Sequence, residues 1–480
     1  MKLINIIKNR TSVAVLLAGV ALSACNPKDF GDTNVSPNGA TTPITSALLT
    51  QVESGLGGVA QSTNQGFYVQ YYSELQYPGN SLYLQTAASW DAFYTGPLED
   101  LQNIITLCTK SPTSVVGSGN PVNQIQIARI LKAYEYSILT DRYGDIPYSK
   151  ALNGDLAVAY DKQQDIYTDL FKELAGAVSS FTTNSPAIKG DIIYNGDLTK
   201  WKKFANSLRM MLAMRLSKVD PATGKTQFMA ALNDANGYIS SNADNFTLTY
   251  VSTFPNSYSA LSTASFFAIS KTIADTLTTY ADPRLPIYGQ LVNSKVKGVP
   301  YGLNTGHAQS WIAANPDYSL AFDASLKTAT SPVVIFPAAY VDLLRAEAAL
   351  NPSYASGENA LTLYKKGITD SWAQWGVTGD INAYTASLGT SAAVTLQQVQ
   401  LQTWLALYGT TQFAWDEWRR TGVPVLTPAP DAVNLTKTIP RRFQYPTTES
   451  LVNGDAYGVA IKAFPYGGND THDNKVWWDK

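Results

Sequence analysis

The chain has 480 residues, a formal net charge of −2 at pH 7, and 15% charged residues, against roughly 25% in an average soluble protein. A near-neutral chain lacks the basic surface that holds a phosphate backbone, so composition argues against nucleic-acid binding. Its 28 tyrosines and 10 tryptophans suit sugars or other neutral polymers. Most single aromatic residues are nevertheless expected in the core.

The chain opens with a short apolar segment, 13–22, preceded by the basic residues Lys2, Lys8 and Arg10. A membrane-spanning helix needs roughly 20 apolar residues, so this segment is too short to be a span. Basic residues followed by a short apolar run are typical of a secretory signal peptide. Leu22–Cys25 (LSAC) resembles the lipobox of a bacterial lipoprotein. That resemblance predicts cleavage after residue 24 and a membrane anchor made only of lipid on Cys25.

The next residues, 25–42, are polar and turn-prone, which predicts a flexible tether before a single folded domain that spans 43–480. The segment 28–32 (KDFGD) resembles the acidic signal that sends some lipoproteins of Bacteroidetes to the outer face of the outer membrane. If Cys25 is lipidated, Cys108 has no partner for a disulfide. We therefore expect Cys108 to be a buried apolar residue on a helix.

Helical spacing of apolar residues dominates the rest of the chain. In the segment 123–149 one apolar stripe is formed by Ile127, Ile130, Leu131, Tyr134 and Ile138. Gly144 and Pro147 are expected to end that helix. The same kind of pattern predicts helices within 165–181, 201–220, 338–351, 358–372 and 397–420. Gly55–Ala60 (GLGGVA) formally fits a dinucleotide-binding motif, but it follows a helical pattern and no strand, so we expect a plain loop there.

Catalytic motifs are missing. The two histidines, His307 and His472, are far apart in sequence, so a zinc site of the usual His-rich or Cys-rich kind cannot be assembled. Neither a G-x-S-x-G elbow nor a P-loop is present. Asp416 and Glu417 are adjacent on a predicted helix and are expected to point to different sides. The sequence gives no positive sign of an enzyme.

The predicted helices tend to come in pairs, which suggests tetratricopeptide-like repeats. Ala360, Tyr364 and Gly367 fit the small–aromatic–small core of a second repeat helix. The preceding helix would pack against it through Leu343, Leu344, Ala346 and Ala348. Small residues at such positions let two helices approach closely.

Several motifs follow one another in a fixed order: LTDRYGDIPYSKAL (139–152), YADPRLPIYG (280–289), YVDLLRAEAAL (340–350), WDEWRRTGVPVL (415–426), IPRRFQYPTTESLVN (439–453) and a terminal KVWWDK. Together they resemble the SusD/RagB family of outer-membrane nutrient-binding lipoproteins, in its branch with R-R-T-G-x-P and W-W-D signatures. The resemblance covers nearly the whole chain after the tether. Thr403 and the pair Thr410–Thr411 depart from the family pattern in their region.

The resemblance implies a mostly α fold in which tetratricopeptide-like helix pairs form a right-handed superhelical scaffold with long loops and little β structure. It also implies a lipid-anchored protein on the cell surface, at the outer membrane, that works with a SusC-like TonB-dependent transporter. Such a protein captures oligosaccharide and delivers it for import without chemistry. Some relatives handle peptides, so a peptide ligand is the alternative. A glycoside hydrolase is a further alternative, which would need two suitably spaced carboxyl groups.

Loop residues are the predicted ligand contacts, because a sugar ring stacks on aromatic side chains and its hydroxyls need amide or hydroxyl partners. The candidates are Tyr77, Tyr83, Trp90, Tyr301, Asn304 and Trp311. In contrast, we expect Arg419 and Arg420 to pair with carboxylates or carbonyls, and Trp477–Asp479 to hold the C-terminus on the helices. No cofactor is expected. Calcium stays open, because Gly467–Asn474 (GGNDTHDN) is rich in oxygen ligands but has no EF-hand spacing.

Overall fold

Helices dominate the protein, whose computed structural model describes residues 44–84, 88–155, 157–183, 185–256, 259, 267–390 and 392–480. Thr45–Lys480 form one unit by their internal contacts. Cys25, the expected signal peptide and the expected tether lie outside the described residues. Within the described ranges, no helix combines the length and apolar character that a membrane crossing requires.

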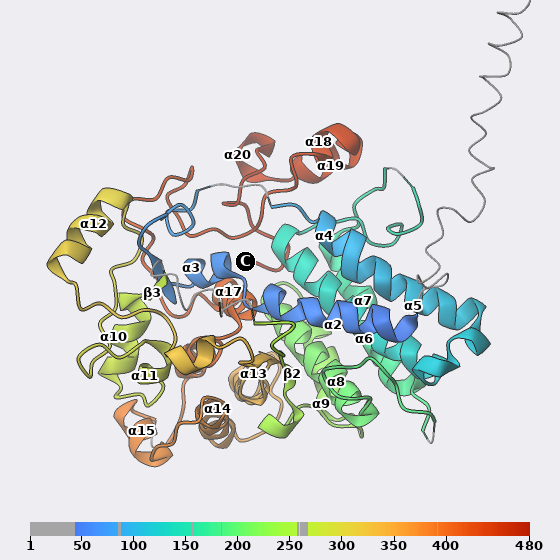
Figure 1. The fold of residues 1–480 in the computed structure, drawn as a ribbon, viewed down its shortest axis with the longest axis horizontal. Coiled ribbons are helices and arrows are strands. Elements are labelled where there is room, and N and C mark those ends of the chain that lie inside the picture. The colour runs from blue at the N-terminus through green and yellow to red at the C-terminus, as the bar shows by residue number, and fades with distance from the viewer. Residues whose placement is uncertain are drawn as a thin grey trace, which may run out of the picture. The chain divides into compact units, whose positions relative to one another are not determined.

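The longer helices occupy every segment where a helix is predicted and also lie outside these segments, as Pro221–Leu232, Lys271–Thr279 and Thr305–Ala314 do (Figure 1). They are α2 (Thr45–Ala60), α5 (Glu99–Lys110), α6 (Pro121–Tyr143), α7 (Gln163–Ser180), α8 (Leu198–Arg215), α9 (Pro221–Leu232), α10 (Lys271–Thr279), α12 (Thr305–Ala314), α13 (Ala338–Leu350), α14 (Ala360–Gln374), α16 (Leu396–Ala406) and α17 (Thr411–Thr421). The segment 397–420 is thus two helices. The break falls where Thr410 leaves helical geometry, with φ −130° and ψ 68°.

Short elements connect these helices. They are α3 (Thr63–Tyr68), α4 (Asp91–Phe93), the π-helical turn η2 (Tyr94–Leu98), α11 (Leu285–Tyr288), α15 (Ile381–Ser387), α18 (Glu449–Val452), α19 (Gly454–Ile461), α20 (Pro465–Gly468) and the 3₁₀ turns η3 (Pro112–Ser114), η4 (Val116–Ser118), η5 (Asn242–Asp244) and η7 (Ala324–Lys327). The strands are β1 (Tyr72–Glu74), β2 (Phe246–Leu248), β3 (Phe267–Ile269) and β4 (Val333–Phe336).

The ends of α6 show how local sequence sets a helix. The Asn120 side chain accepts hydrogen bonds from the backbone N–H groups of Val122 and Asn123, at 2.9 and 3.2 Å, and Pro121 takes the first helical position. Both features are favoured at a helix start. At the other end Gly144 has φ +86°, a left-handed conformation that favours glycine. The predicted stop at Gly144 is confirmed.

Neighbouring helices pack as pairs, α6 with α7, α8 with α9 and α13 with α14. In the last pair, a Cβ added to Gly367 would lie 2.7 Å from Leu343 Cγ and 3.2 Å from the Ala339 carbonyl oxygen. In the α8–α9 pair, a Cβ added to Gly224 of α9 would lie 2.8 Å from the Ala213 carbonyl oxygen of α8. A glycine on the second helix therefore lets each of these two pairs approach closely. The predicted mostly α, tetratricopeptide-like fold is confirmed.

The predicted packing face of α13 is divided between two cores. Leu343 and Ala346 pack with Tyr364 and the other buried side chains of α14, as expected. Leu344 and Ala348 instead belong to the main core of the domain. A helix with a partner on each side buries two stripes, so α13 reads as apolar nearly all round.

The expected loop at Gly55–Ala60 is wrong, because α2 continues to Ala60. Gly57 lies so close to the Tyr250 ring and to Leu248 that no side chain would fit there. Gly55 and Gly58 face open space and supply no such contact. The packing of α2 against β2, α5 and α17 thus outweighs the low helix propensity of glycine.

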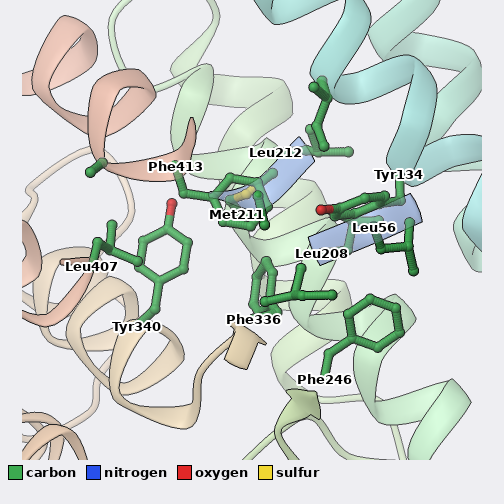
Figure 2. Packing of buried hydrophobic residues seen from close by; sticks show 14 of the residues in the cluster. Leu56, Tyr134, Leu208, Met211, Leu212, Phe246, Phe336, Tyr340, Leu407 and Phe413 are labelled. Atoms are coloured by element: carbon green, nitrogen blue, oxygen red, sulfur yellow. The ribbon is translucent and has the colours of Figure 1, made fainter. Parts of the chain in front are cut away.

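The main core lies where these helices meet β2 and β4 (Figure 2). Phe204 and Phe246 stack with ring centroids 4.0 Å apart, and Phe336 meets Phe204 edge-on at 5.7 Å. Tyr340 and Phe413 stack on the other side of this cluster at 6.0 Å. Such aromatic packing makes the helical frame rigid. Cys108 is buried in the same core as predicted.

The four strands form two small antiparallel sheets. β2 pairs with β4 through an irregular register, and β1 pairs with β3 so that Tyr72 faces Ile269 and Glu74 faces Phe267. The Ser73 hydroxyl also donates to the Val299 carbonyl at 2.9 Å. β1 therefore brings the loop that follows it beside the chain near residue 300.

The C-terminus is held by the signature residues as predicted. Trp478 is fully buried, and its ring N–H donates to Asp141 Oδ1 of α6 at 2.6 Å. The Arg419 guanidinium lies 4.6 Å from the Trp478 ring centroid and donates to the Arg441 carbonyl at 2.7 Å. Arg420 makes a two-point contact with Glu347 at 2.6 and 2.7 Å. These residues are structural.

Asp416 and Glu417 do not point to different sides, contrary to the sequence-based expectation. Both carboxylates are buried, and both approach Arg215, at 3.3 and 3.5 Å. Arg215, the last residue of α8, extends to α17 and contacts both of the adjacent carboxylates. Neither carboxylate is therefore available to a ligand.

Candidate functional site

Three segments, 75–84, 299–318 (which includes α12) and 427–435, contact one another, and we call their joint surface the loop face. The Val433 N–H donates to the Leu82 carbonyl at 2.9 Å. The Asn304 N–H donates to Asp431 Oδ2 at 2.8 Å. These two bonds join positions that are 351 and 127 residues apart in the chain. The loop face is thus a product of the tertiary fold.

The first segment turns sharply after β1. The buried carboxylate of Glu74 accepts backbone hydrogen bonds from Asn80 and Ser81, and its burial raises its pKa to about 7. Tyr83 adopts a left-handed conformation with φ +64°. Its hydroxyl accepts a hydrogen bond from the Ala429 N–H at 3.0 Å. The turn and the third segment therefore hold each other in place.

The second segment approaches the third at a glycine. Gly302 has φ +72°, and a Cβ there would collide with Ala429. Two residues later the Asn304 side chain caps α12 by accepting from the His307 N–H at 3.0 Å. His307 Nδ1 also lies 2.7 Å from Asp431 Oδ2. The Asn304 backbone and His307 together lower the pKa of Asp431.

Two of the six predicted contact residues offer aromatic surface on the loop face. Tyr77 is 66% exposed. Trp311 is half-buried on α12, where it packs against the buried side chains of Leu75 and Val299. Its ring is also near Tyr318, with centroids 6.5 Å apart. Trp311 is therefore held in position with part of its surface open.

Three predicted contacts are buried: Tyr83 is 0%, Trp90 3% and Tyr301 8% exposed. Tyr83 and Tyr301 pack on each other beneath the loop face, with ring centroids 6.4 Å apart. Trp90 belongs to a separate aromatic cluster with Tyr94, Tyr143, Tyr160 and Tyr445. A ring covered by protein cannot stack on a sugar, so we correct the expected role of these three residues from ligand contact to support.

The sixth predicted contact is Asn304. It is partly exposed, but its side-chain oxygen is used by the α12 cap and its side-chain nitrogen lies 3.1 Å from His307 Nδ1. One amide hydrogen can still donate outward, because a side-chain amide carries two N–H donors. Asn304 therefore keeps one side-chain N–H donor for a further hydrogen bond at the N-terminus of α12, and its role as a ligand contact stays a prediction.

Sequence reasoning missed the third segment of the loop face. It contributes Asp431, the partner of His307, and the exposed apolar side chains of Val433 and Leu435. The two prolines of TPAPDAVNL predict a turn-rich loop but not its neighbours. Only the pairing with residues near 82 and 304 shows that this loop shares a surface with the predicted contacts.

The two carboxylates of the loop face each have a basic partner. Asp317 pairs at 2.6 Å with Lys297, which precedes the second segment and lies 6.0 Å from the Trp311 ring centroid. Asp431 pairs with His307. The surface therefore offers rings, amides and paired charges, a combination suited to a neutral ligand.

The described ranges contain no group of three or more His, Cys, Asp or Glu side chains placed to hold a metal ion. In the oxygen-rich segment Gly467–Asn474, Asp470 pairs with Arg442, and Asp473 accepts from Asn434 and Thr436. Both carboxylates are therefore bound by side chains of the protein.

Known proteins resemble this chain along most of its length. Residues 37–446 match the SusD-like family described as starch-binding and associating with the outer membrane. No match was found among the curated proteins. A solved chitin-binding protein is 29% identical, with a TM-score of 0.77, and the match covers 91% of this chain and 99% of that one.

Two further solved structures have the same fold. A chitin-binding SusD homologue from Flavobacterium johnsoniae is 25% identical, with a TM-score of 0.76, covering 91% of this chain and 98% of its own. A SusD homologue from Parabacteroides distasonis is 23% identical, with a TM-score of 0.78 and the same two coverages. The family match and the shared fold agree with each other, and the chain therefore belongs to the SusD/RagB family.

Proposed function

We propose that this protein captures oligosaccharides of the chitin type on its loop face and passes them to a SusC-like TonB-dependent transporter, while lipid on Cys25 holds it at the cell surface. The observation that carries the ligand class is the chitin-binding protein that is 29% identical across 91% of this chain. The family description supports the place at the outer membrane.

The chemistry of the loop face supports a sugar ligand. The C–H faces of N-acetylglucosamine rings stack on aromatic surface, which Tyr77 and Trp311 provide. The acetamido groups and hydroxyls need donors and acceptors, which Asn304 and the loop backbone provide. Trp311 is already fixed by Leu75 and Val299, so little side-chain entropy is lost when a ligand binds.

Isothermal titration with N-acetylglucosamine hexamer tests the proposal, with maltohexaose and a neutral hexapeptide as competing ligand classes. We expect the N-acetylglucosamine hexamer to bind more tightly than either. Loss of an aromatic contact that contributes about 1–2 kcal/mol weakens binding roughly five- to thirtyfold. Tyr77→Ala and Trp311→Ala should each show a loss of that order. Phe254→Ala removes an exposed aromatic side chain outside the three segments and should bind as the wild type does.

The other outcomes are equally informative. Unchanged affinity in both variants would move the binding site away from the loop face. Binding of the hexapeptide alone would replace the ligand class with peptides. Shortened products after incubation with the glycan, detected by mass spectrometry, would favour a hydrolase. Purification of the acylated protein from its native host together with a TonB-dependent barrel would support the partner and the anchor.

A further inference from the structure

A pocket lined by no residue of the three segments of the loop face lies between α2, the α4–η2–α5 stretch and α6. It encloses about 320 Å³, within the range of roughly 300–1,000 Å³ that is usual for small-molecule sites. Its walls are mainly apolar and include Val52, Val59, Phe93 and Pro97. The proposed glycan function makes no use of this pocket.

Two acidic side chains, Glu135 and Asp100, line this mainly apolar pocket, and Glu135 is the buried one. Glu135 of α6 lines it, is 1% exposed, and has no hydrogen-bond partner for its Oε2 atom among the described residues. Burying a carboxyl group without a partner costs free energy, and here it raises the pKa of Glu135 to about 8. A ligand that pairs with the carboxylate would remove that cost.

The charges around the pocket indicate the sign of the ligand. The other titratable residue that lines it, Asp100, is also acidic, and no lysine, arginine or histidine lines it. Burial raises the pKa of Glu135 more than the charge of Arg142 lowers it. Arg142 makes its own contacts elsewhere: it donates to Gln412 at 2.6 Å and to the Val59 carbonyl at 3.3 Å, and it lies over the Phe93 ring. A cation is therefore favoured over an anion.

Glycines keep the pocket open. Gly55 on α2 and Gly96 at the kink of η2 both line it, and a Cβ at either position would meet no atom within 4 Å. Glycine inside a helix costs roughly 1 kcal/mol relative to alanine, so Gly55 lowers the stability of α2 without any packing contact in return. Any larger side chain at 55 would project into the free space.

We propose that this pocket binds a small, mainly apolar molecule that carries one ammonium group, and that Glu135 pairs with that group. The apolar walls would cover the hydrocarbon part, and the acidic floor would select an amine over an acid of the same size. The inference does not depend on the ligand of the loop face.

Titration of the full chain with phenethylamine tests the proposal, with phenylacetate as a probe of similar size and opposite charge. We expect phenethylamine to bind at least tenfold more tightly than phenylacetate. Glu135→Gln keeps the shape of the side chain but cannot ionise to pair with the ammonium group, and it should weaken phenethylamine binding about tenfold or more. Gly55→Leu should fill the pocket and abolish binding.

Gly58→Leu is the matched control, because Gly58 is on the same helix, also faces open space and does not line the pocket. This variant should bind phenethylamine as the wild type does. Absence of phenethylamine binding to the wild type, equal binding of both probes, or full binding by Gly55→Leu would each overturn the proposal. If Glu135→Gln fails to fold, the pair of glycine variants still decides it.

Discussion

The close approach of α13 and α14 at Gly367 gives a sharp test of the helical frame. In a Gly367→Val variant the new Cβ would lie 2.7 Å from Leu343 Cγ and 3.2 Å from the Ala339 carbonyl oxygen. Carbon atoms normally pack about 3.5–4.0 Å apart, so the two helices must separate or Leu343 must move. Overpacking of this kind costs about 1–3 kcal/mol, and the two extra methyl groups place valine toward the upper end.

Valine also gains a few tenths of a kcal/mol over glycine in helix propensity, which leaves a net loss of about 2 kcal/mol. Urea denaturation followed by circular dichroism measures this loss as a lower free energy of unfolding. Gly58→Val on α2 controls for propensity, because a side chain there meets nothing within 4 Å. It should be as stable as the wild type or slightly more stable. Equal stability of the two variants would refute the close packing of this pair.

Three further predictions concern buried groups. Trp478→Ala removes a fully buried ring and its hydrogen bond to Asp141. The free energy of unfolding, measured by urea denaturation, should therefore fall by about 3–5 kcal/mol. A loss under about 1 kcal/mol would show that this residue does not anchor the C-terminus. Glu347→Ala removes both contacts, of 2.6 and 2.7 Å, that Glu347 makes with the buried Arg420. The free energy of unfolding should fall by about 3 kcal/mol in the same assay. Glu347→Gln keeps a hydrogen-bonding side chain and should lower the free energy of unfolding by less. Glu135 has its pKa raised from 4.5 to about 8, so the folded protein retains a proton that the unfolded chain has already lost, and stability falls as pH rises through this window. The fall should reach roughly 3 kcal/mol between pH 5 and pH 8, and Glu135→Gln should abolish this part of the pH dependence; an identical pH profile for both proteins would contradict the burial of this carboxyl group.

The helical frame could be predicted because apolar residues recur at helical spacing over long segments. The stripe through Ile127 and Tyr134 lies on α6, and Gly144 ends that helix as expected. Glycine was the main source of error. Gly57 marks a close contact with Tyr250 inside α2, and a single glycine in a sequence does not distinguish a close helix contact from a loop.

The loop face could be predicted only in part. Aromatic residues can be located in loops from the sequence, but spacing in a loop carries no information on burial. Tyr83 and Tyr301 therefore looked equivalent to Tyr77, although the fold covers the first two and exposes the third. Asp431 was not foreseen, because its contact with Asn304 joins positions 127 residues apart.

The most direct test of the account is a crystal structure of the protein bound to N-acetylglucosamine hexamer. The account predicts a sugar ring stacked on Tyr77 or Trp311, with an acetamido or hydroxyl group within hydrogen-bonding distance of the Asn304 side chain. A well-ordered oligosaccharide bound outside the segments 75–84, 299–318 and 427–435 would contradict it.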